Sequence, residues 1–171
     1  PYTTLAGAGK PVAGKPGAAE QTAGLEARRQ NRAGGVIPAR SDREPKALID
    51  LFVDMAAAVD ATIDRVADAD GAPAALADFL ARHNLGTDIR MAPDPWLDTI
   101  PWADRPILTI TKGPSDGSDD VSVTAAFAAI AETGTLMALS GPDSPTTLNF
   151  LPDNHVVIFR ASQVMGAYED G

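Results

Sequence analysis

The chain has 171 residues, 44% of them hydrophobic and none of them cysteine, so it can form one ordinary domain but no disulfide, thiolate nucleophile or Cys-ligated cluster. Its net charge of -9 is uneven, because residues 1–46 carry eight Lys and Arg against four Asp and Glu, whereas residues 47–171 carry six against nineteen. Such an acidic domain repels phosphate backbones and anionic lipids, and no apolar run approaches the roughly 20 residues of a membrane span, so we expect a cytoplasmic protein that binds neither nucleic acid nor membranes.

Residues 1–35 are predicted to form a flexible, partly disordered arm. Residues 1–24 contain almost no large apolar side chain, so burial cannot offset the entropy of ordering them. Residues 9–16 spell the start of a phosphate-binding loop, but Pro11 removes an amide from the cradle and Pro16 replaces the required hydroxyl. We interpret that match as a result of composition. Residues 36–171 are predicted to form a single α/β domain.

Helices and strands are predicted to alternate along this domain. Apolar side chains after Pro45 fall on one helical face, and they are Leu48, Leu51, Phe52, Met55 and Val59. A strand is expected over 61–66, a helix from Pro73 to its close at 84–86, and strands over 87–91, 107–111 and 121–124. A small-residue helix is expected over 125–131, followed by strands over 135–139 and 155–160. The alternation predicts a mostly parallel sheet covered by helices on both faces, with ligand sites beyond the carboxyl ends of its strands.

The turn at residues 132–135 is the first candidate site. Gly134 allows the backbone to turn with no side chain in the way, while Glu132, Thr133 and Thr135 supply one carboxylate and two hydroxyls. Polar groups that converge on bare backbone suit a small ligand. A capped turn with Glu132 in water fits the same residues, and the sequence leaves the two readings open.

The long connection after residue 139 is the second candidate site, because loops of this length often carry function. Its candidate ligand-binding residues are Ser140, Gly141, Thr146, Thr147 and Asn149. The alternative reading is a surface loop pinned by its apolar residues. His155 follows as a candidate general base at the start of a strand, although no nucleophile motif accompanies it.

No metal site is predicted. Asp116, Ser118 and Asp120 have the alternate spacing of a calcium loop, but Phe127 stands where the twelfth position requires a carboxylate.

Three motifs of the C-terminal part occur together: Ala-Glu-Thr-Gly-Thr at 131–135, Ser-Gly-Pro at 140–142 and Leu-Pro-x-x-His at 151–155. This combination resembles the lactate-utilisation (LUD) domain family, and within it the group of lactate-utilisation protein C. The resemblance extends from residues 37–40 to residue 170. It implies a fold of the NagB/RpiA/CoA-transferase group. It also implies work beside two partner proteins whose iron–sulfur clusters serve the oxidation of L-lactate to pyruvate, with no cofactor in this chain.

The resemblance favours an accessory subunit that binds a small carboxylate ligand or its partner proteins. The alternative is a stand-alone enzyme of the CoA-transferase-like fold group that acts on a carboxylate or acyl substrate, with Glu132 and His155 as its candidate catalytic residues. A third reading is a ligand-sensing module that docks through its basic arm. Whether the chain is an enzyme, and whether it forms a homo-oligomer, stays open at this level.

Overall fold

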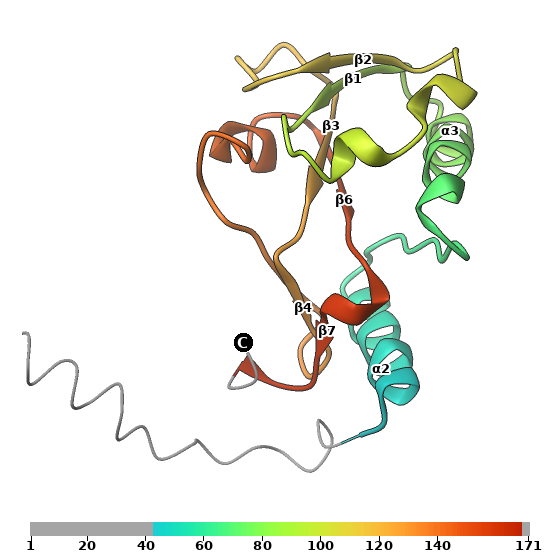
Figure 1. Cartoon of the computed structure of the whole chain (residues 1–171), viewed down its shortest axis with the longest axis vertical. Coiled ribbons are helices and arrows are strands. Elements are labelled where there is room, and N and C mark those ends of the chain that lie inside the picture. The colour runs from blue at the N-terminus through green and yellow to red at the C-terminus, as the bar shows by residue number, and fades with distance from the viewer. Residues whose placement is uncertain (1–42, 169–171) are drawn as a thin grey trace, which may run out of the picture. The chain divides into compact units, whose positions relative to one another are not determined.

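This computed structural model describes residues 43–168, which contain two α-helices, two β-sheets and several 3-10 turns (Figure 1). The predicted arm and its boundary with the domain, between residues 35 and 36, lie outside the described residues.

Sheet A consists of four parallel strands in the order β2-β1-β3-β6. Their bounds are Asp88–Met91 for β1, Thr109–Lys112 for β2, Val121–Ala125 for β3 and Asn154–Ile158 for β6. In β3 the four residues from Val121 to Thr124 are all buried, as expected for a central strand of a parallel sheet. The predicted α/β class with a mostly parallel sheet is therefore confirmed, while membership of the NagB/RpiA/CoA-transferase group stays a prediction.

One face of sheet A packs against α3 (Ala72–His83), which follows the 3-10 turn η1 (Ala69–Gly71). Leu76 and Leu80 of α3 belong to a core cluster with buried side chains of β1 and β3, which are Ile89, Met91, Val121 and Val123. The short turns η2 (Leu97–Thr99) and η3 (Trp102–Asp104) occupy the connection between β1 and β2. Helix α3 ends at Asn84, whose left-handed φ of 52° closes it as the sequence predicted.

The opposite face of sheet A is covered by loops. Side chains alternate along a strand, so Arg90, Ser122 and Thr124 lie on the face away from α3. The Ser122 hydroxyl donates a 2.7 Å hydrogen bond to the carbonyl of Leu148 in η4 (Thr146–Asn149). Arg90 binds Asp119 in the connection between β2 and β3. At these positions a loop and a 3-10 turn cover the face for which a helix was expected.

Sheet B is smaller and has the order β5-β4-β7, with β4 antiparallel to β5 and parallel to β7. Its strands are β4 (Ala128–Ile130), β5 (Thr135–Met137) and β7 (Val164–Met165). Figure 1 shows β3 leading directly into β4. The small-residue helix predicted over 125–131 is therefore wrong. Backbone pairing on both sides of β4 outweighs the helix propensity of its alanines, since tertiary context overrides so weak a preference.

Helix α2 (Pro45–Ala57) covers sheet B, and the predicted amphipathic helix is confirmed. Phe52 and Ala56 form a second core cluster with Ala129 and Ala131. The ring of Phe52 also meets the edge of Phe159, with 5.3 Å between the ring centroids. The alanines of the β4 segment have small side chains, and these allow the helix to lie close to the sheet.

Two other predictions near α2 are wrong. Val59 was placed on the apolar face of the helix, but α2 ends at Ala57 and Val59 is 72% exposed. Residues 61–66 were predicted as a strand but form irregular backbone with no strand partner. The left-handed φ of Asp60, 64°, turns the chain away from the helix axis before this segment begins.

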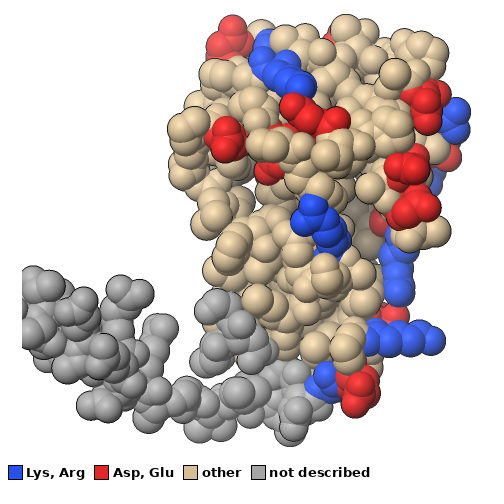
Figure 2. Space-filling model, in the orientation of Figure 1, with Lys and Arg blue, Asp and Glu red and all other residues tan. Residues whose placement is uncertain are grey.

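Charge is not evenly spread over the face shown in Figure 2. Asp and Glu side chains gather over the part that holds sheet A, whereas the surface around β4 and β7 is mostly uncharged. Among residues 43–168, no helix has the length and apolar character that crossing a membrane requires.

Candidate functional site

The strand order of sheet A reverses its direction between β1 and β3. The chain leaves β1 toward β2 on one side, and it leaves β3 toward β6 on the other. In open parallel sheets, ligands bind outside the carboxyl ends of the strands at such a reversal of strand order. The sequence predicted a site of this kind without locating it.

A pocket of about 220 Å³ lies at this place. Its walls come from segments directly after three neighbouring strands: Asp94 and Trp96 after β1, Ala126 and Phe127 after β3, and Arg160 after β6. The pocket is also lined by Ala125 at the end of β3, by Gln163 of η5 (Ala161–Gln163), and by Leu139 and Ser144.

Arg160 is the cationic side chain of the pocket. Its guanidinium carbon lies 4.2 Å from the centroid of the Trp96 ring, which is the geometry of a cation–π interaction. Arg160 forms no ion pair with a carboxylate of residues 43–168, whereas Arg65, Arg82, Arg90 and Lys112 each form one. The guanidinium is thus held on an aromatic surface while its charge stays available.

Gln163 fixes the wall around Arg160. Its side-chain nitrogen donates to the carbonyls of Ala126 at 2.8 Å and Phe127 at 3.0 Å. Its side-chain oxygen accepts a 2.7 Å hydrogen bond from the backbone nitrogen of Arg160. One amide therefore ties the segment after β6 to the segment after β3.

Asp94 fixes the opposite wall. Its Oδ1 accepts hydrogen bonds from the backbone nitrogens of Trp96 at 2.7 Å and Leu97 at 3.4 Å, and so caps the turn that carries the Trp96 ring. This carboxylate is engaged with backbone, which makes it a positioning group and a source of negative charge in the pocket.

Two apolar side chains of the pocket lining are exposed to solvent. Phe127 is 50% exposed and Leu139 is 59% exposed, and both line the pocket. The Ser144 hydroxyl is buried and has no hydrogen-bond partner among the described residues. The backbone of Ser144 pairs with Gly141 through two hydrogen bonds of 3.1 Å, so the loop is closed on itself at this point.

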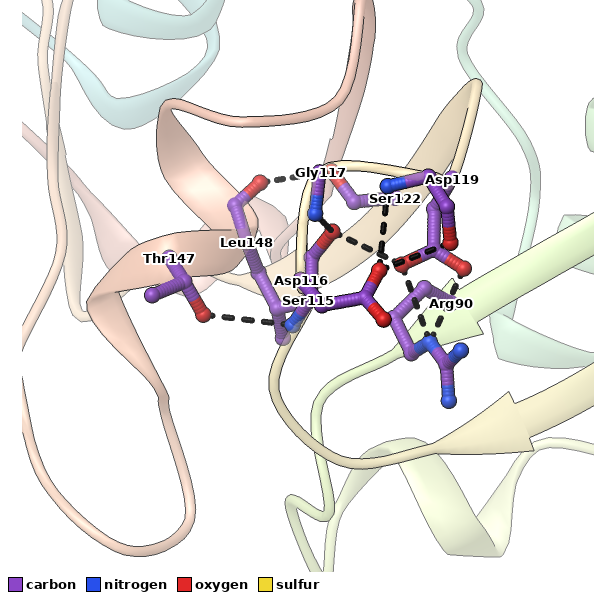
Figure 3. A network of polar contacts seen from close by, with 9 residues as sticks. Arg90, Ser115, Asp116, Gly117, Asp119, Ser122, Thr147 and Leu148 are labelled. Atoms are coloured by element: carbon purple, nitrogen blue, oxygen red, sulfur yellow. Dashed lines mark hydrogen bonds and ion pairs between the residues drawn. The ribbon is translucent and has the colours of Figure 1, made fainter.

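A polar network on the face of sheet A away from α3 holds the long connection after residue 139 (Figure 3). Arg90 donates from Nε to both Asp119 oxygens at 3.0 and 3.1 Å, and the Ser115 hydroxyl donates to Asp119 at 2.7 Å. The backbone nitrogen of Ser115 donates to the Thr147 hydroxyl at 3.2 Å. Strand β1, the crossing loop 113–120 and η4 are thereby joined. Nearby, hydrogen bonds from the Ser118 hydroxyl and backbone lower the pKa of Asp116.

The turn at residues 132–135 joins β4 to β5, and its bare backbone faces α2. Gly134 has a φ of 66°, and a Cβ added there would lie 2.7 Å from the backbone nitrogen of Ala56. The close approach that the sequence predicted for a ligand is therefore an approach to a helix. The hydroxyls of Thr133 and Thr135 lie 2.8 Å apart and both contact the Tyr168 hydroxyl, and these hydrogen bonds lower the Tyr168 pKa, with Thr133 the larger cause.

The remaining predicted site residues lie in the long loop and at β6. Ser140 and Thr146 share a hydroxyl–hydroxyl hydrogen bond, and the Asn149 side-chain oxygen is buried without a partner among the described residues. His155 shares a 2.7 Å hydrogen bond with Thr124, and burial lowers the pKa of its imidazole.

None of the ten predicted catalytic and ligand-binding residues lines the pocket, although Ser140 and Gly141 lie between its lining residues Leu139 and Ser144. Their functional roles stay predictions. The residues that sequence reasoning missed are Asp94, Trp96, Arg160 and Gln163. Asp94 and Trp96 follow one predicted strand, Arg160 ends another and Gln163 follows it. The expectation of a site at the carboxyl ends therefore pointed to their segments, but it did not indicate which segments meet.

Within residues 43–168, no group of three or more His, Asp and Glu side chains could hold a metal ion.

The fold and the pocket define an α/β protein with an open parallel sheet and a cavity at the strand ends. Residues 116–171 match the family model described as LUD domain, which confirms the family resemblance over the last third of the chain. That segment contains β3 to β7, Arg160 and Gln163. A search of curated proteins and a search of solved structures each gave no match.

Proposed function

We propose that this chain is an accessory, ligand-binding subunit of a lactate-utilisation system, in which separate iron–sulfur proteins oxidise L-lactate to pyruvate. The match of residues 116–171 to the LUD domain supports the metabolic setting. The observation that carries the ligand-binding part is the pocket where the carboxyl ends of β1, β3 and β6 meet.

Binding fits this pocket better than catalysis does. The polar side chains Asp94 and Gln163 form hydrogen bonds with backbone groups, Asp94 through Oδ1, and these bonds position the walls of the pocket. An amide such as that of Gln163 is not a general acid or base. The imidazole of His155 bonds to Thr124 and does not line the pocket. The electron transfer of lactate oxidation needs redox centres, and this chain has no cysteine to hold an iron–sulfur cluster.

The opening of the pocket suits a subunit that works beside partners. Phe127 and Leu139 expose apolar surface next to the site, and clustered exposed apolar groups are typical of interaction surfaces. A ligand bound there would lie within reach of a docked partner.

Reconstitution tests this proposal. We expect the two iron–sulfur partner proteins to reduce an artificial electron acceptor with L-lactate faster when the full chain is present, and the chain to co-elute with them in size-exclusion chromatography. A partner pair that is fully active without the chain would contradict the accessory role. Turnover of a carboxylate or acyl substrate by the purified chain alone would favour the stand-alone enzyme.

A further inference from the structure

We infer that the pocket between the ends of β1, β3 and β6 binds a small monocarboxylate, with Arg160 as the residue that receives the carboxylate. This inference rests on the proposed function, because it names the ligand class of the same pocket.

The charge of Arg160 is the first argument. Residues 47–171 contain six Lys and Arg against nineteen Asp and Glu, and four of those six cations are ion-paired. Arg160 forms no ion pair within residues 43–168, although it lies in an acidic domain and lines a pocket. An anionic ligand would supply the missing counter-charge.

The geometry of Arg160 is the second argument. The guanidinium carbon of Arg160 lies 4.2 Å from the centroid of the Trp96 ring, and a guanidinium that stacks on an aromatic ring keeps its N–H groups at its edge. A carboxylate accepts two parallel hydrogen bonds from such an edge, an arrangement that selects planar two-oxygen anions. The hydrogen bonds of Gln163 hold the segment that carries Arg160, and those of Asp94 hold the segment that carries Trp96. The guanidinium is therefore positioned before the ligand binds.

Size and polarity limit the rest of the ligand. The volume of about 220 Å³ is below the roughly 300–1,000 Å³ of pockets for drug-sized molecules, so an acid of a few carbons fits best. Phe127 and Leu139 offer apolar contacts to its short chain.

Asp94 sets the charge of the ligand. Its carboxylate lines the same pocket and is fixed by two backbone hydrogen bonds, so it cannot turn away from a second negative group. Like charges close together repel, which disfavours dicarboxylates and phosphate relative to monocarboxylates.

Calorimetric titration of the purified full chain with pyruvate, L-lactate, malonate and inorganic phosphate tests the inference. We expect saturable binding of pyruvate or L-lactate, and weaker binding of malonate and phosphate. Arg160→Gln should weaken monocarboxylate binding at least about tenfold, because hydrogen bonds between charged groups are involved. Arg105→Gln is the matched control, since Arg105 is exposed, forms no ion pair within residues 43–168 and lies outside the pocket.

Three results would overturn the inference: no saturable binding of either monocarboxylate, equal binding by the Arg160→Gln and Arg105→Gln variants, or tighter binding of malonate or phosphate. Equal thermal unfolding midpoints for both variants and the unaltered chain establish that the fold is intact. The two proposals fail separately. If the chain binds a monocarboxylate through Arg160 but lactate oxidation proceeds without the chain, only the accessory role is contradicted. If lactate oxidation requires the chain but its Arg160→Gln variant binds pyruvate normally, only the ligand assignment is contradicted.

Discussion

Gly134 shows how one residue decides the packing of two elements. Its positive φ permits the tight turn between β4 and β5, and its missing side chain lets that turn lie against the backbone of α2 at Met55 and Ala56. Packing against α2 therefore explains why a glycine stands at this position, whether or not a ligand binds there.

Gly134→Ala should therefore destabilise the protein strongly. The added Cβ would lie 2.7 Å from Ala56 N and 2.8 Å from Met55 C, which backbone atoms can relieve only by moving α2. We expect a loss of about 2–4 kcal/mol in the free energy of unfolding, from left-handed strain and overpacking together. Urea denaturation measures it. Gly86→Ala is the control, because a Cβ there meets nothing within 4 Å; equal losses in both variants would contradict the packing role.

His155 couples the stability of sheet A to pH. Burial lowers its pKa from the ordinary 6.5, so the folded protein holds fewer protons than the unfolded chain just below that pH. The stability contributed by neutral His155 is complete above pH 6.5 and is lost as pH falls from 6.5 toward the folded pKa. We expect His155→Gln, which keeps hydrogen-bonding groups toward Thr124, to show a smaller decrease between pH 7.5 and 5.5 in chemical denaturation. The same slope in both proteins would rule out this linkage.

At the scale of elements, the crossing loop 113–120 takes the place that a helix was predicted to fill. It is held by Asp119, which binds both Arg90 of β1 and the hydroxyl of Ser115. The backbone nitrogen of Ser115 also bonds to Thr147, so the same loop anchors the long connection after residue 139. Leu139 and Ser144 of that part of the chain line the pocket.

Asp119→Asn tests this anchor. The side chains of Arg90 and Asp119 are only 23% and 15% exposed, so removal of one charge leaves the other poorly solvated. We expect a loss of about 2 kcal/mol in the free energy of unfolding and faster proteolysis within residues 113–120. The exposed pair of Arg65 and Asp50 provides the comparison, and Asp50→Asn should cost less than about 1 kcal/mol. Losses of the same size would mean that the network does not hold the loop.

The wrong helix over 125–131 also belongs to this scale. Alanines at 125, 126, 128, 129 and 131 favour a helix locally, and no short-range signal in the sequence opposes it. The strand forms because β5 and β7, from later in the chain, supply partners on both sides of β4. The small side chains allow close packing in the observed strand, as they would in a helix, so they do not distinguish the two conformations.

At the scale of the whole molecule, the residues that the structure describes form two core clusters. The larger cluster runs from Ala72 to Leu148, and the smaller joins α2 to the β4 segment. The sequence of residues 1–35 offers almost no large apolar side chain to add to either.

Removal of residues 1–35 should therefore leave stability nearly unchanged. We expect the unfolding free energy of residues 36–171 in guanidinium to agree with that of the full chain within about 0.5 kcal/mol, as for surface changes that touch no core contact. A loss well above 1 kcal/mol would show that the arm contributes to the folded domain.

By itself the sequence determined what short-range chemistry controls. The amphipathic pattern after Pro45 predicted α2, Asn84 predicted the end of α3, and β-branched runs predicted β3 and β6, because helix faces, caps and strand propensity depend on neighbouring residues. The motifs of residues 131–155 predicted a resemblance to the LUD family, and residues 116–171 match the model of that domain.

Only the tertiary structure decided which segments meet. Asp94, Ala126 and Arg160 are separated by more than thirty residues in sequence, and they share a pocket because β1, β3 and β6 are neighbours in one sheet. Strand order depends on long-range pairing, to which local propensity is blind. For the same reason, the sequence indicated that Gly134 has a close neighbour, but only the fold identified that neighbour as the backbone of α2.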